Sequence, residues 1–344
     1  MNDPQWETLL RAIEGDPLNP PPVGLIIDSP WLPGWAGAKM IDYFADERVW
    51  VEANLAAVRR FDRVIMLPGF WAEYGMCTEP SAFGAKCVFH ENAFPHAEKT
   101  LADSAAIDWL KKPNCRTDGL LPFVVRRLQR CRGEIERAGH RIRFATARGP
   151  LNVASYLLGQ TDFLIALKTD PDRTHRLLDI VTEFLCDWIG WQIDNFDSID
   201  GVFVLDDLIG FLGDGDFREF ALPYLKRIFQ ARNISVGFLH NDAAGMVTAA
   251  HLDEMGANMF NFSHNHPINE MRAAAGPNVV LLGNIPPRDV LAAGSPDRVR
   301  HCTAEMLGKL ADRRRLIVSC GGGAPPGAPT ENIDALCDAA AGRT

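Results

Sequence analysis

The sequence predicts an α/β protein that folds as a single (β/α)8 barrel. Eight short apolar runs, each stopped by polar, glycine or proline residues, are typical of buried parallel strands. Helical patterns separate these runs, and eight alternating strand–helix units favour a barrel over a doubly wound sheet. The 344 residues fit such a barrel, which runs from about 200 to more than 400 residues. Two average domains would also fit this length, but no Gly/Ser linker divides the chain, so one domain is expected over residues 1–344.

The strand candidates span the chain from end to end. They are Val23–Ser29, Arg63–Pro68, Arg143–Arg148, Gly201–Asp207, Ser235–His240, Asn258–Ser263, Val279–Asn284 and Leu316–Cys320.

The helical candidates alternate with these strands. They are Val51–Phe61, Leu164–Asp194, Phe217–Ala231, Ala243–Met255, Asp289–Ala293, Asp297–Ala311 and Glu331–Ala341. Within the long second pattern, Asp170 is suited to cap a helix that Pro171 begins, because proline fits the first helical turn.

The second and third strands are much farther apart than one helix requires. Roughly 75 residues separate them, and long segments in compact domains are usually functional or disordered. This insertion, about Gly69–His140, follows a strand's carboxyl end, where barrel enzymes carry their sites, so we expect a lid over the barrel mouth. It carries Trp71, Tyr74, Cys77, Glu79, His90 and His96.

Composition and charge exclude several classes of protein. Hydrophobic residues make up 47% of the chain and charged residues 23%, which argues against disorder. The net charge of −9 disfavours a nucleic-acid partner. No apolar run is long enough for a membrane helix, and Met1–Pro4 does not begin a signal peptide. A cytoplasmic enzyme with a small-molecule substrate is therefore expected, with its eight cysteines reduced.

Polar residues at two strand ends suggest a metal site at the barrel mouth. His240 and Asp242 are two residues apart, so both side chains can point to the same side of an extended strand. Cys320 ends the last strand. Imidazole, carboxylate and thiolate are all zinc ligands, and three of them would leave one position open for catalysis. The alternative is that His240 and Asp242 are capping residues and Cys320 a packed thiol.

Other candidates admit two interpretations each. Asp206 or Asp207 could serve as an acid, base or substrate-orienting group, or as a capping carboxylate. The His264–His266 segment could bind metal or form an exposed loop, and Gly321–Gly323 could cradle an anion or form a turn. An aromatic cluster could wall a substrate pocket or form the core of the lid. Its members are Trp31, Trp35, Phe70, Trp71 and Tyr74.

Several motifs, in order along the chain, resemble those of the uroporphyrinogen decarboxylase superfamily, whose fold is a (β/α)8 barrel. One is a "GPf-x-x-A-x-x-l-x-G … dP" signature. The matching segments are Gly149-Pro150-Leu151, Ala154, Leu158-Gly159, Asp170-Pro171, Phe220, Leu222-Pro223-Tyr224-Leu225-Lys226, His240, Leu282-Gly283-Asn284-Ile285, Ser319-Cys320-Gly321 and Thr330-Glu331-Asn332-Ile333.

Two branches of this superfamily imply different chemistry. True uroporphyrinogen decarboxylases carry an arginine-rich segment, R-Q-A-G-R, that clamps the substrate's carboxylates, and the corresponding Asp28–Lys39 contains no arginine. The cobalamin-associated branch, similar to the methylcobalamin:coenzyme M methyltransferases, has an H-x-C plus distant Cys zinc motif. His240 and Cys320 match it, Asp242 replaces the first cysteine, and Cys77–Gly84 resembles that branch's T-V-E-A-E-A-x-G segment, with Glu79 on its first glutamate.

This resemblance implies a methyltransferase or demethylase that uses zinc or another divalent metal. His240, Asp242 and Cys320 would hold the metal, with Glu79 as a fourth or exchangeable ligand and Asp206 as an orienting or acid/base group. Trp31, Trp35, Trp71 and Tyr74 would line the pocket. The corrinoid would belong to a partner protein, because the chain has no D-x-H-x-x-G signature. Two alternatives remain: a metal-free decarboxylase of a small acid or tetrapyrrole, and a non-catalytic module that docks a corrinoid protein.

Overall fold

Eight parallel strands form one curled sheet, which confirms the predicted α/β barrel class. The computed structural model describes residues 1–27 and 29–343, and its sheet has the order β2-β1-β10-β9-β8-β7-β6-β5. Each predicted strand is present, with bounds that differ by a few residues. The strands are β1 (Val23–Ile26), β2 (Val64–Leu67), β5 (Phe144–Arg148), β6 (Gly201–Leu205), β7 (Val236–Asn241), β8 (Met259–Phe262), β9 (Val280–Ile285) and β10 (Leu316–Cys320).

The pairing closes the barrel everywhere except at one seam. The first strand in the chain, β1, pairs with the last, β10, as barrel closure requires. Among the described residues, no backbone ladder joins β2 to β5, the two ends of the sheet. The long insertion connects these same two strands, so the seam lies where the chain departs from the regular strand–helix repeat.

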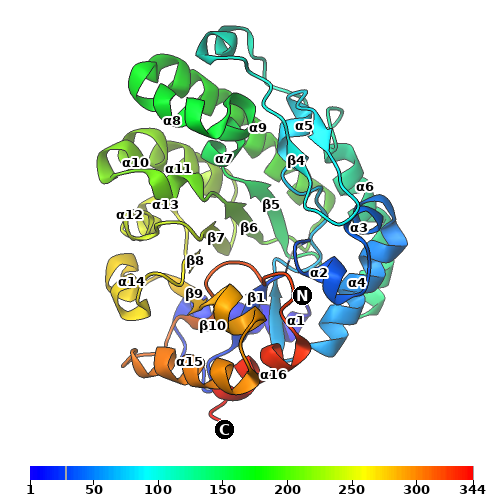
Figure 1. Cartoon of the computed structure of the whole chain (residues 1–344), viewed down its shortest axis with the longest axis vertical. Coiled ribbons are helices and arrows are strands. Elements are labelled where there is room, and N and C mark those ends of the chain that lie inside the picture. The colour runs from blue at the N-terminus through cyan, green and yellow to red at the C-terminus, as the bar shows by residue number, and fades with distance from the viewer. Residues whose placement is uncertain (28, 344) are drawn as a thin grey trace.

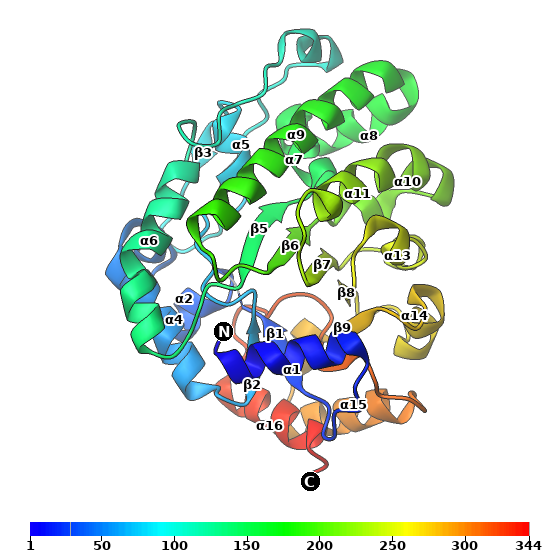
Figure 2. The same ribbon diagram turned by 180° about the vertical axis from the view of Figure 1, so that it is seen from behind.

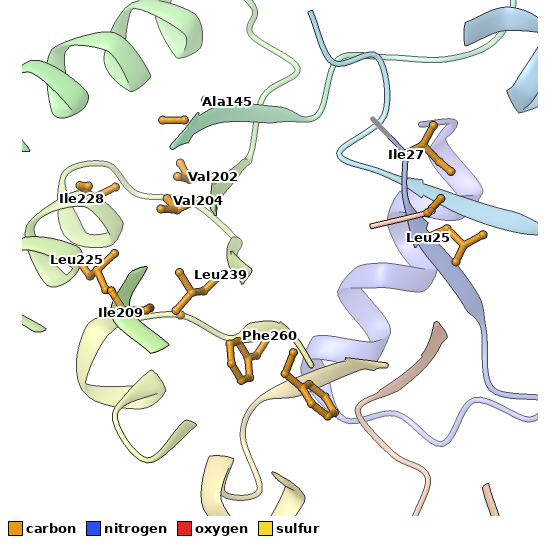
Figure 3. Close-up of a cluster of buried hydrophobic side chains, with 14 of the residues drawn as sticks. Leu25, Ile27, Ala145, Val202, Val204, Ile209, Leu225, Ile228, Leu239 and Phe260 are labelled. Carbon is orange, nitrogen blue, oxygen red and sulfur yellow. The ribbon is translucent and has the colours of Figure 1, made fainter. Parts of the chain in front are cut away.

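Alternating side chains divide the strands between two apolar clusters. Ile26, Phe203 and Phe238 belong to the cluster inside the barrel, whereas their neighbours Leu25, Val204 and Leu239 pack outward against helices. Figure 3 shows this outer layer, in which strand residues such as Val204 and Leu239 face Leu225 and Ile228 of a covering helix. This period of two determines which residues reach the barrel mouth.

The helix α1 (Asp3–Glu14) closes the amino end of the barrel. Its Trp6 packs edge-on against Phe144 inside the barrel, at 5.6 Å between ring centroids, and Figure 2 shows the helix across that side of the sheet. It also bridges the seam: Gln5 donates to the Val64 carbonyl of β2, while the Met1 amine donates to the Arg141 carbonyl just before β5.

The other helices that lie outside the insertion surround the sheet (Figure 1). They are α2 (Leu32–Trp35), α3 (Met40–Ala45), α4 (Glu47–Arg60), α7 (Pro150–Leu158), α8 (Gln160–Thr169), α9 (Pro171–Asn195), η2 (Leu208–Phe211), α10 (Asp214–Phe220), α11 (Leu222–Gln230), α12 (Met246–Ala249), α13 (Leu252–Met255), α14 (Ile268–Ala275), η3 (Pro287–Ala292), α15 (Pro296–Gly308) and α16 (Thr330–Ala340).

Proline breaks two of the predicted helical patterns. The pattern over Leu164–Asp194 becomes α8 and α9, with Pro171 in the first turn of α9 as expected. Asp170 stands before it but makes no side-chain cap; its carboxylate instead accepts hydrogen bonds from Ser104 and Arg173. The pattern over Phe217–Ala231 similarly divides into α10 and α11 before Pro223.

The insertion contains a mixture of short elements and one long helix. Its elements are α5 (Thr78–Ala82), β3 (Cys87–Val88), β4 (His96–Ala97), η1 (Ser104–Trp109) and α6 (Leu121–Arg137). The helix α6 buries an apolar face against the core and occupies the outer layer beside α4. The segment before it is the true excess over a regular barrel. None of the described helices is both long and apolar enough to cross a membrane.

Candidate active site

The carboxyl ends of β5, β6, β7 and β8 bring polar side chains together at one end of the barrel. Because Phe203 faces the barrel interior, the alternation of β6 turns Leu205 and then Asp207 to the same side. Phe238 and then His240 follow the same rule in β7. Asp206, between the two inward positions, points the other way, toward the surrounding helices.

Asp207, His240 and Asp242 form a cluster with metal-ligand character. One ligand atom from each lies within 4.8 Å of the others. His240 Nε2 is 3.5 Å from Asp207 Oδ1, and the Asp242 backbone N–H donates to the same oxygen at 3.0 Å. Burial raises the pKa of Asp207, and the Asp242 carboxylate adds to this effect, while His240 opposes it. A divalent cation would relieve this repulsion between carboxylates.

Asn261 of β8 orients the imidazole of His240. His240 Nδ1 is 2.7 Å from Asn261 Oδ1. The amide nitrogen of Asn261 donates to the carbonyls of Leu282 and Cys320, which turns its oxygen toward the ring. Nδ1 therefore donates to Asn261, and Nε2 faces Asp207 at 3.5 Å, where its lone pair would be available to a metal ion bound in the cluster. This is how ligating histidines are usually held, so these residues fit a divalent metal.

Asp206 is completely buried and caps a helix. Its carboxylate accepts hydrogen bonds from the backbone N–H groups of Leu151 at 2.9 Å and Asn152 at 3.1 Å, in the first turn of α7. Burial raises its pKa well above the ordinary value, while these two hydrogen bonds act in the opposite direction. The capping interpretation therefore describes Asp206 in this structure, and its neighbour Asp207 faces His240.

Glu79 pairs with a buried arginine. Glu79 Oε1 accepts the Arg148 backbone N–H at 3.0 Å, and its Oε2 is 3.3 Å from the guanidinium. Glu73 binds the other guanidinium nitrogen at 2.8 Å and accepts the Ser29 hydroxyl at 2.6 Å. Arg148 thus occupies both carboxylate oxygens of Glu79. Arg148 ends β5, and its side chain lies on the same side of the strand as Phe144, facing the barrel interior. The two glutamates raise the pKa of Arg148 against the effect of burial.

Tyr156 of α7 is influenced electrostatically by both of these groups. The pKa of Tyr156 is raised to about 12, mainly by burial; Arg148 opposes this rise, and the carboxylates of Asp207, Asp206 and Glu79 contribute to it. The phenol therefore stays neutral at physiological pH and is within electrostatic reach of both the acidic cluster and the arginine.

Cys320 lies outside the acidic cluster. Ile317 faces the barrel interior, so alternation turns Val318 and Cys320 to the outer core. The Cys320 thiol, fully buried, donates to the carbonyls of Gly322 at 3.4 Å and Gly323 at 3.6 Å. The glycine segment does reach the cluster: a Cβ at Gly322, whose φ is +107°, would come within 3.0 Å of Asp242 Oδ2.

The four predicted pocket aromatics pack in three places. Trp31 and Trp35 stack at 5.2 Å, and their indole nitrogens donate to Ala328 and Thr330. Trp71 is inside the barrel, with its ring edge-on to Phe203. Tyr74 stacks with Phe44 in the insertion layer. These contacts are those of core packing, the alternative to a substrate wall.

The exposed histidine loop after β8 makes a structural contact. His266 Nε2 accepts the backbone N–H of Gly245 at 3.0 Å, and His264 is exposed. Neither belongs to the group of ligand atoms around His240.

Sequence reasoning missed Asp207 as the partner of His240, and it missed Arg148, Glu73, Asn261 and Tyr156. The alternation of side chains along β5, β6 and β8 could have indicated Arg148, Asp207 and Asn261. Each of these residues lies an even number of positions after an apolar side chain that faces the barrel interior. Glu73 and Tyr156 come from outside the strands and have no such signal.

Comparison with known families identifies relatives in sequence over the whole chain. The family model described as Uroporphyrinogen decarboxylase (URO-D) matches residues 4–342. The uroporphyrinogen decarboxylase of Thioalkalivibrio sulfidiphilus is 25% identical over 359 residues, which cover 98% of each chain. That of Cellvibrio japonicus is 28% identical over 272 residues, covering 75% of this chain and 74% of its own.

Two solved structures resemble the fold. A methyltransferase from Methanosarcina mazei superposes with a TM-score of 0.82 at 20% identity, covering 98% of both chains. A B12-independent methionine synthase from Shewanella sp. W3-18-1 has a TM-score of 0.52 at 8% identity, covering 84% of this chain and 86% of its own. At these identities the likeness concerns the fold.

Proposed function

We propose that this chain, which belongs to the uroporphyrinogen decarboxylase family, is a metal-dependent methyltransferase. It would move a methyl group between a small molecule and a corrinoid carrier on a partner protein. The observation that carries this proposal is the cluster of Asp207, His240 and Asp242, whose ligand atoms lie within 4.8 Å of one another. Asn261 holds the imidazole in the tautomer that a metal requires.

The charge at the barrel mouth argues against a polyanionic porphyrinogen. Asp207 and Asp242 add negative charge there, and the guanidinium of Arg148 is already paired with Glu73 and Glu79. Asp28–Lys39 contains no arginine. A substrate with several carboxylates needs cations that are free to bind it, so a small neutral or cationic methyl donor or acceptor fits better.

The residues of the cluster would hold a divalent ion through two carboxylate oxygens and His240 Nε2. A metal bound there would act as a Lewis acid on the heteroatom that carries or receives the methyl group. Two oxygens and one nitrogen form a harder ligand set than one containing thiolates, which favours an oxygen or nitrogen substrate over a thiol. Tyr156, neutral at physiological pH, would donate a hydrogen bond to the bound substrate.

The corrinoid partner follows from the resemblance of His240, Cys320 and Cys77–Gly84 to the cobalamin-associated branch. The Methanosarcina mazei protein that shares the fold is a methyltransferase, which supports methyl transfer as the reaction class. In this proposal the chain binds the small molecule, and the corrinoid protein presents its cobalt at the barrel mouth.

Metal analysis and a methylcobalamin demethylation assay test the proposal together. Purified protein should contain close to one divalent metal ion per chain, and its activity should fall at least 100-fold in His240→Ala and Asp207→Asn with loss of the metal. His301→Ala is the matched control, because this histidine is exposed on α15, where it pairs with Glu305 at 3.4 Å. Full metal content in His240→Ala would refute the assignment of the site.

Decarboxylation is the second candidate, because the relatives in sequence are named uroporphyrinogen decarboxylases. It predicts carbon dioxide release from a carboxylated substrate by protein stripped of metal, with no demethylation of methylcobalamin. Those two results together would favour the decarboxylase over the methyltransferase.

A further inference from the structure

Five basic side chains gather at the amino end of the barrel, on the side opposite the acidic cluster. They come from the last turn of α14 and from the segment that connects α15 to β10, and they are Arg272, Lys309, Arg313, Arg314 and Arg315. They line two adjoining cavities of about 550 and 480 Å³, which share Arg314. The chain therefore concentrates positive charge here although its net charge is −9.

Asp312 is the one carboxylate among the described residues that line the two cavities. Arg314 binds it, with Nε at 2.9 Å and Nη2 at 2.7 Å from Asp312 Oδ2. Arg272 donates instead to three backbone carbonyls, at 3.2, 2.6 and 2.7 Å. Lys309 is exposed and has no hydrogen-bond or ion-pair partner within the described part of the chain. Most of this positive charge therefore has no carboxylate to balance it.

The carboxyl ends of three helices balance part of the charge. Arg315 donates to the last two carbonyls of α1, Arg313 donates to the Leu307 carbonyl in the last turn of α15, and α14 ends beside them. A helix carboxyl end carries about half a negative charge, so these three ends and Asp312 leave about 2.5 positive charges unbalanced. Capping of helices alone does not account for five cations.

Some of the donors at the cavity wall are free to bind a ligand. Arg272 Nε and Arg315 Nη1 donate to no acceptor among the described residues, and neither atom is fully buried. The pKa of Arg272 is lowered to about 10, mainly by burial; Arg315 contributes to this fall, and Asp312 opposes it. An anion between these cations would relieve their mutual repulsion.

We propose that the two cavities form a second ligand site, which binds a small organic phosphate ester. The phosphate group would lie in the larger cavity, between Arg272, Lys309 and Arg315. It carries about two negative charges at neutral pH, close to the unbalanced positive charge of the site. Guanidinium groups suit it because they donate to phosphate oxygens in pairs.

The organic part of the ester would extend past Arg314 into the smaller cavity. Pro17, Leu18 and Pro21 line that cavity and offer it an apolar surface. Both volumes lie within the range of about 300–1,000 Å³ that is usual for small-molecule sites. The site is at the other end of the barrel from Asp207 and His240, so it is independent of the proposed methyl transfer.

Titration calorimetry of the whole folded chain with phenyl phosphate tests the proposal. The Kd should be below about 1 mM at an ionic strength of about 0.15 M, where long-range attraction is screened. Inorganic phosphate should bind about 5-fold more weakly, because it lacks the apolar part, and phenol should not bind. Asp207→Asn should bind phenyl phosphate as wild type does, which separates this site from any metal in the acidic cluster.

Variants at exposed positions identify the cations that bind. Lys309→Gln with Arg314→Gln should weaken phenyl phosphate binding at least 10-fold. The matched control is Lys86→Gln with Arg132→Gln, two cations in exposed ion pairs outside the cavities, and its Kd should stay within 2-fold of wild type. Asp312→Asn should tighten binding at least 3-fold, because it removes the carboxylate and releases Arg314. Misfolding could not produce such a gain.

Absence of phenyl phosphate binding to folded wild type, or equal weakening in the two double variants, would overturn the proposal. Loss of binding in Asp207→Asn would place the phosphate at the acidic cluster and also overturn it. Vesicles containing phosphatidate should not sediment the chain, because its net charge of −9 opposes an anionic bilayer. Sedimentation that Lys309→Gln with Arg314→Gln abolishes would assign the site to a lipid headgroup instead of a small ester.

Discussion

Asp206 and Asp207 are chemically identical neighbours, yet their side chains lie in opposite directions. The alternation of β6 sends Asp206 toward α7 and Asp207 toward His240. The same parity sends Arg148 inward and Cys320 outward. At the scale of single residues, one step along a strand therefore separates a helix cap from a candidate metal ligand.

Arg148 should be the most sensitive single charge in the protein. Its side chain is 8% exposed, between two glutamates that are each 2% exposed. Arg148→Met would leave both carboxylates buried without a cation, and breaking a buried ion pair in this way costs about 3–5 kcal/mol. Urea unfolding should show this loss in the free energy of unfolding.

A matched surface variant separates this effect from the loss of any arginine. Arg11 pairs with Asp16 at 2.9 Å while both side chains are largely exposed, so Arg11→Met should cost less than about 1 kcal/mol. Adding Glu73→Gln and Glu79→Gln to Arg148→Met should recover stability. No recovery in that triple variant would show that the glutamate charges are not the cause.

At the scale of elements, α7 depends on its contact with β6. The helix has no side-chain cap of its own, and Asp206 supplies one from the neighbouring strand. A Cβ at Gly149 would come within 2.2 Å of Asp206 Oδ2, so the carboxylate fits only because glycine precedes the helix.

Asp206→Ala should destabilise the protein by about 2 kcal/mol, because it removes a buried cap from the first turn of α7. Its metal content should equal that of wild type, since Asp207 carries the ligand oxygen. Thermal unfolding and metal analysis measure the two effects, with Asp253→Ala, an exposed first-turn carboxylate of α13, as the control. Metal loss with unchanged stability would assign Asp206 to the site instead.

At the scale of the whole molecule, α1 completes the interior of the barrel. Trp6 is 5% exposed and packs against Phe144, whereas Trp109 in the insertion is 86% exposed. Trp6→Ala should lower the free energy of unfolding by about 3–5 kcal/mol through loss of buried area and a cavity. Trp109→Ala should change it by less than about 0.5 kcal/mol. Equal effects of the two substitutions in urea unfolding would contradict this role for α1.

His140 makes the stability of the seam depend on pH. Burial beside Phe70 lowers the pKa of His140 to about 4, from an ordinary value of 6.5. Between these values the unfolded chain binds the proton and the folded one does not, so unfolding becomes easier as the pH falls from 6.5 to 4. The full effect below pH 4 is about 3 kcal/mol.

The variant His140→Gln should lose this pH dependence while keeping that of the remaining groups. Subtracting its unfolding free energies from those of wild type across pH 4–7 isolates the contribution of His140. The exposed His301→Gln is the control and should follow the wild-type curve. A difference curve that is flat over this range would exclude His140 as its source.

The barrel could be predicted from the amino-acid sequence, because apolar runs and the polar, glycine or proline residues that end them can be recognised without knowledge of the tertiary structure. The sequence also predicted that His240 and Asp242 lie close together, since residues two apart on one strand point to the same side. It could not decide which neighbouring strand supplies the third side chain, and it favoured Cys320 where the structure presents Asp207. The seam between β2 and β5, the pairing of Glu73 and Glu79 with Arg148, and the closure by α1 emerge only in the folded chain. These contacts join residues far apart in the chain, and their energies come from burial and charge pairing that no local pattern records.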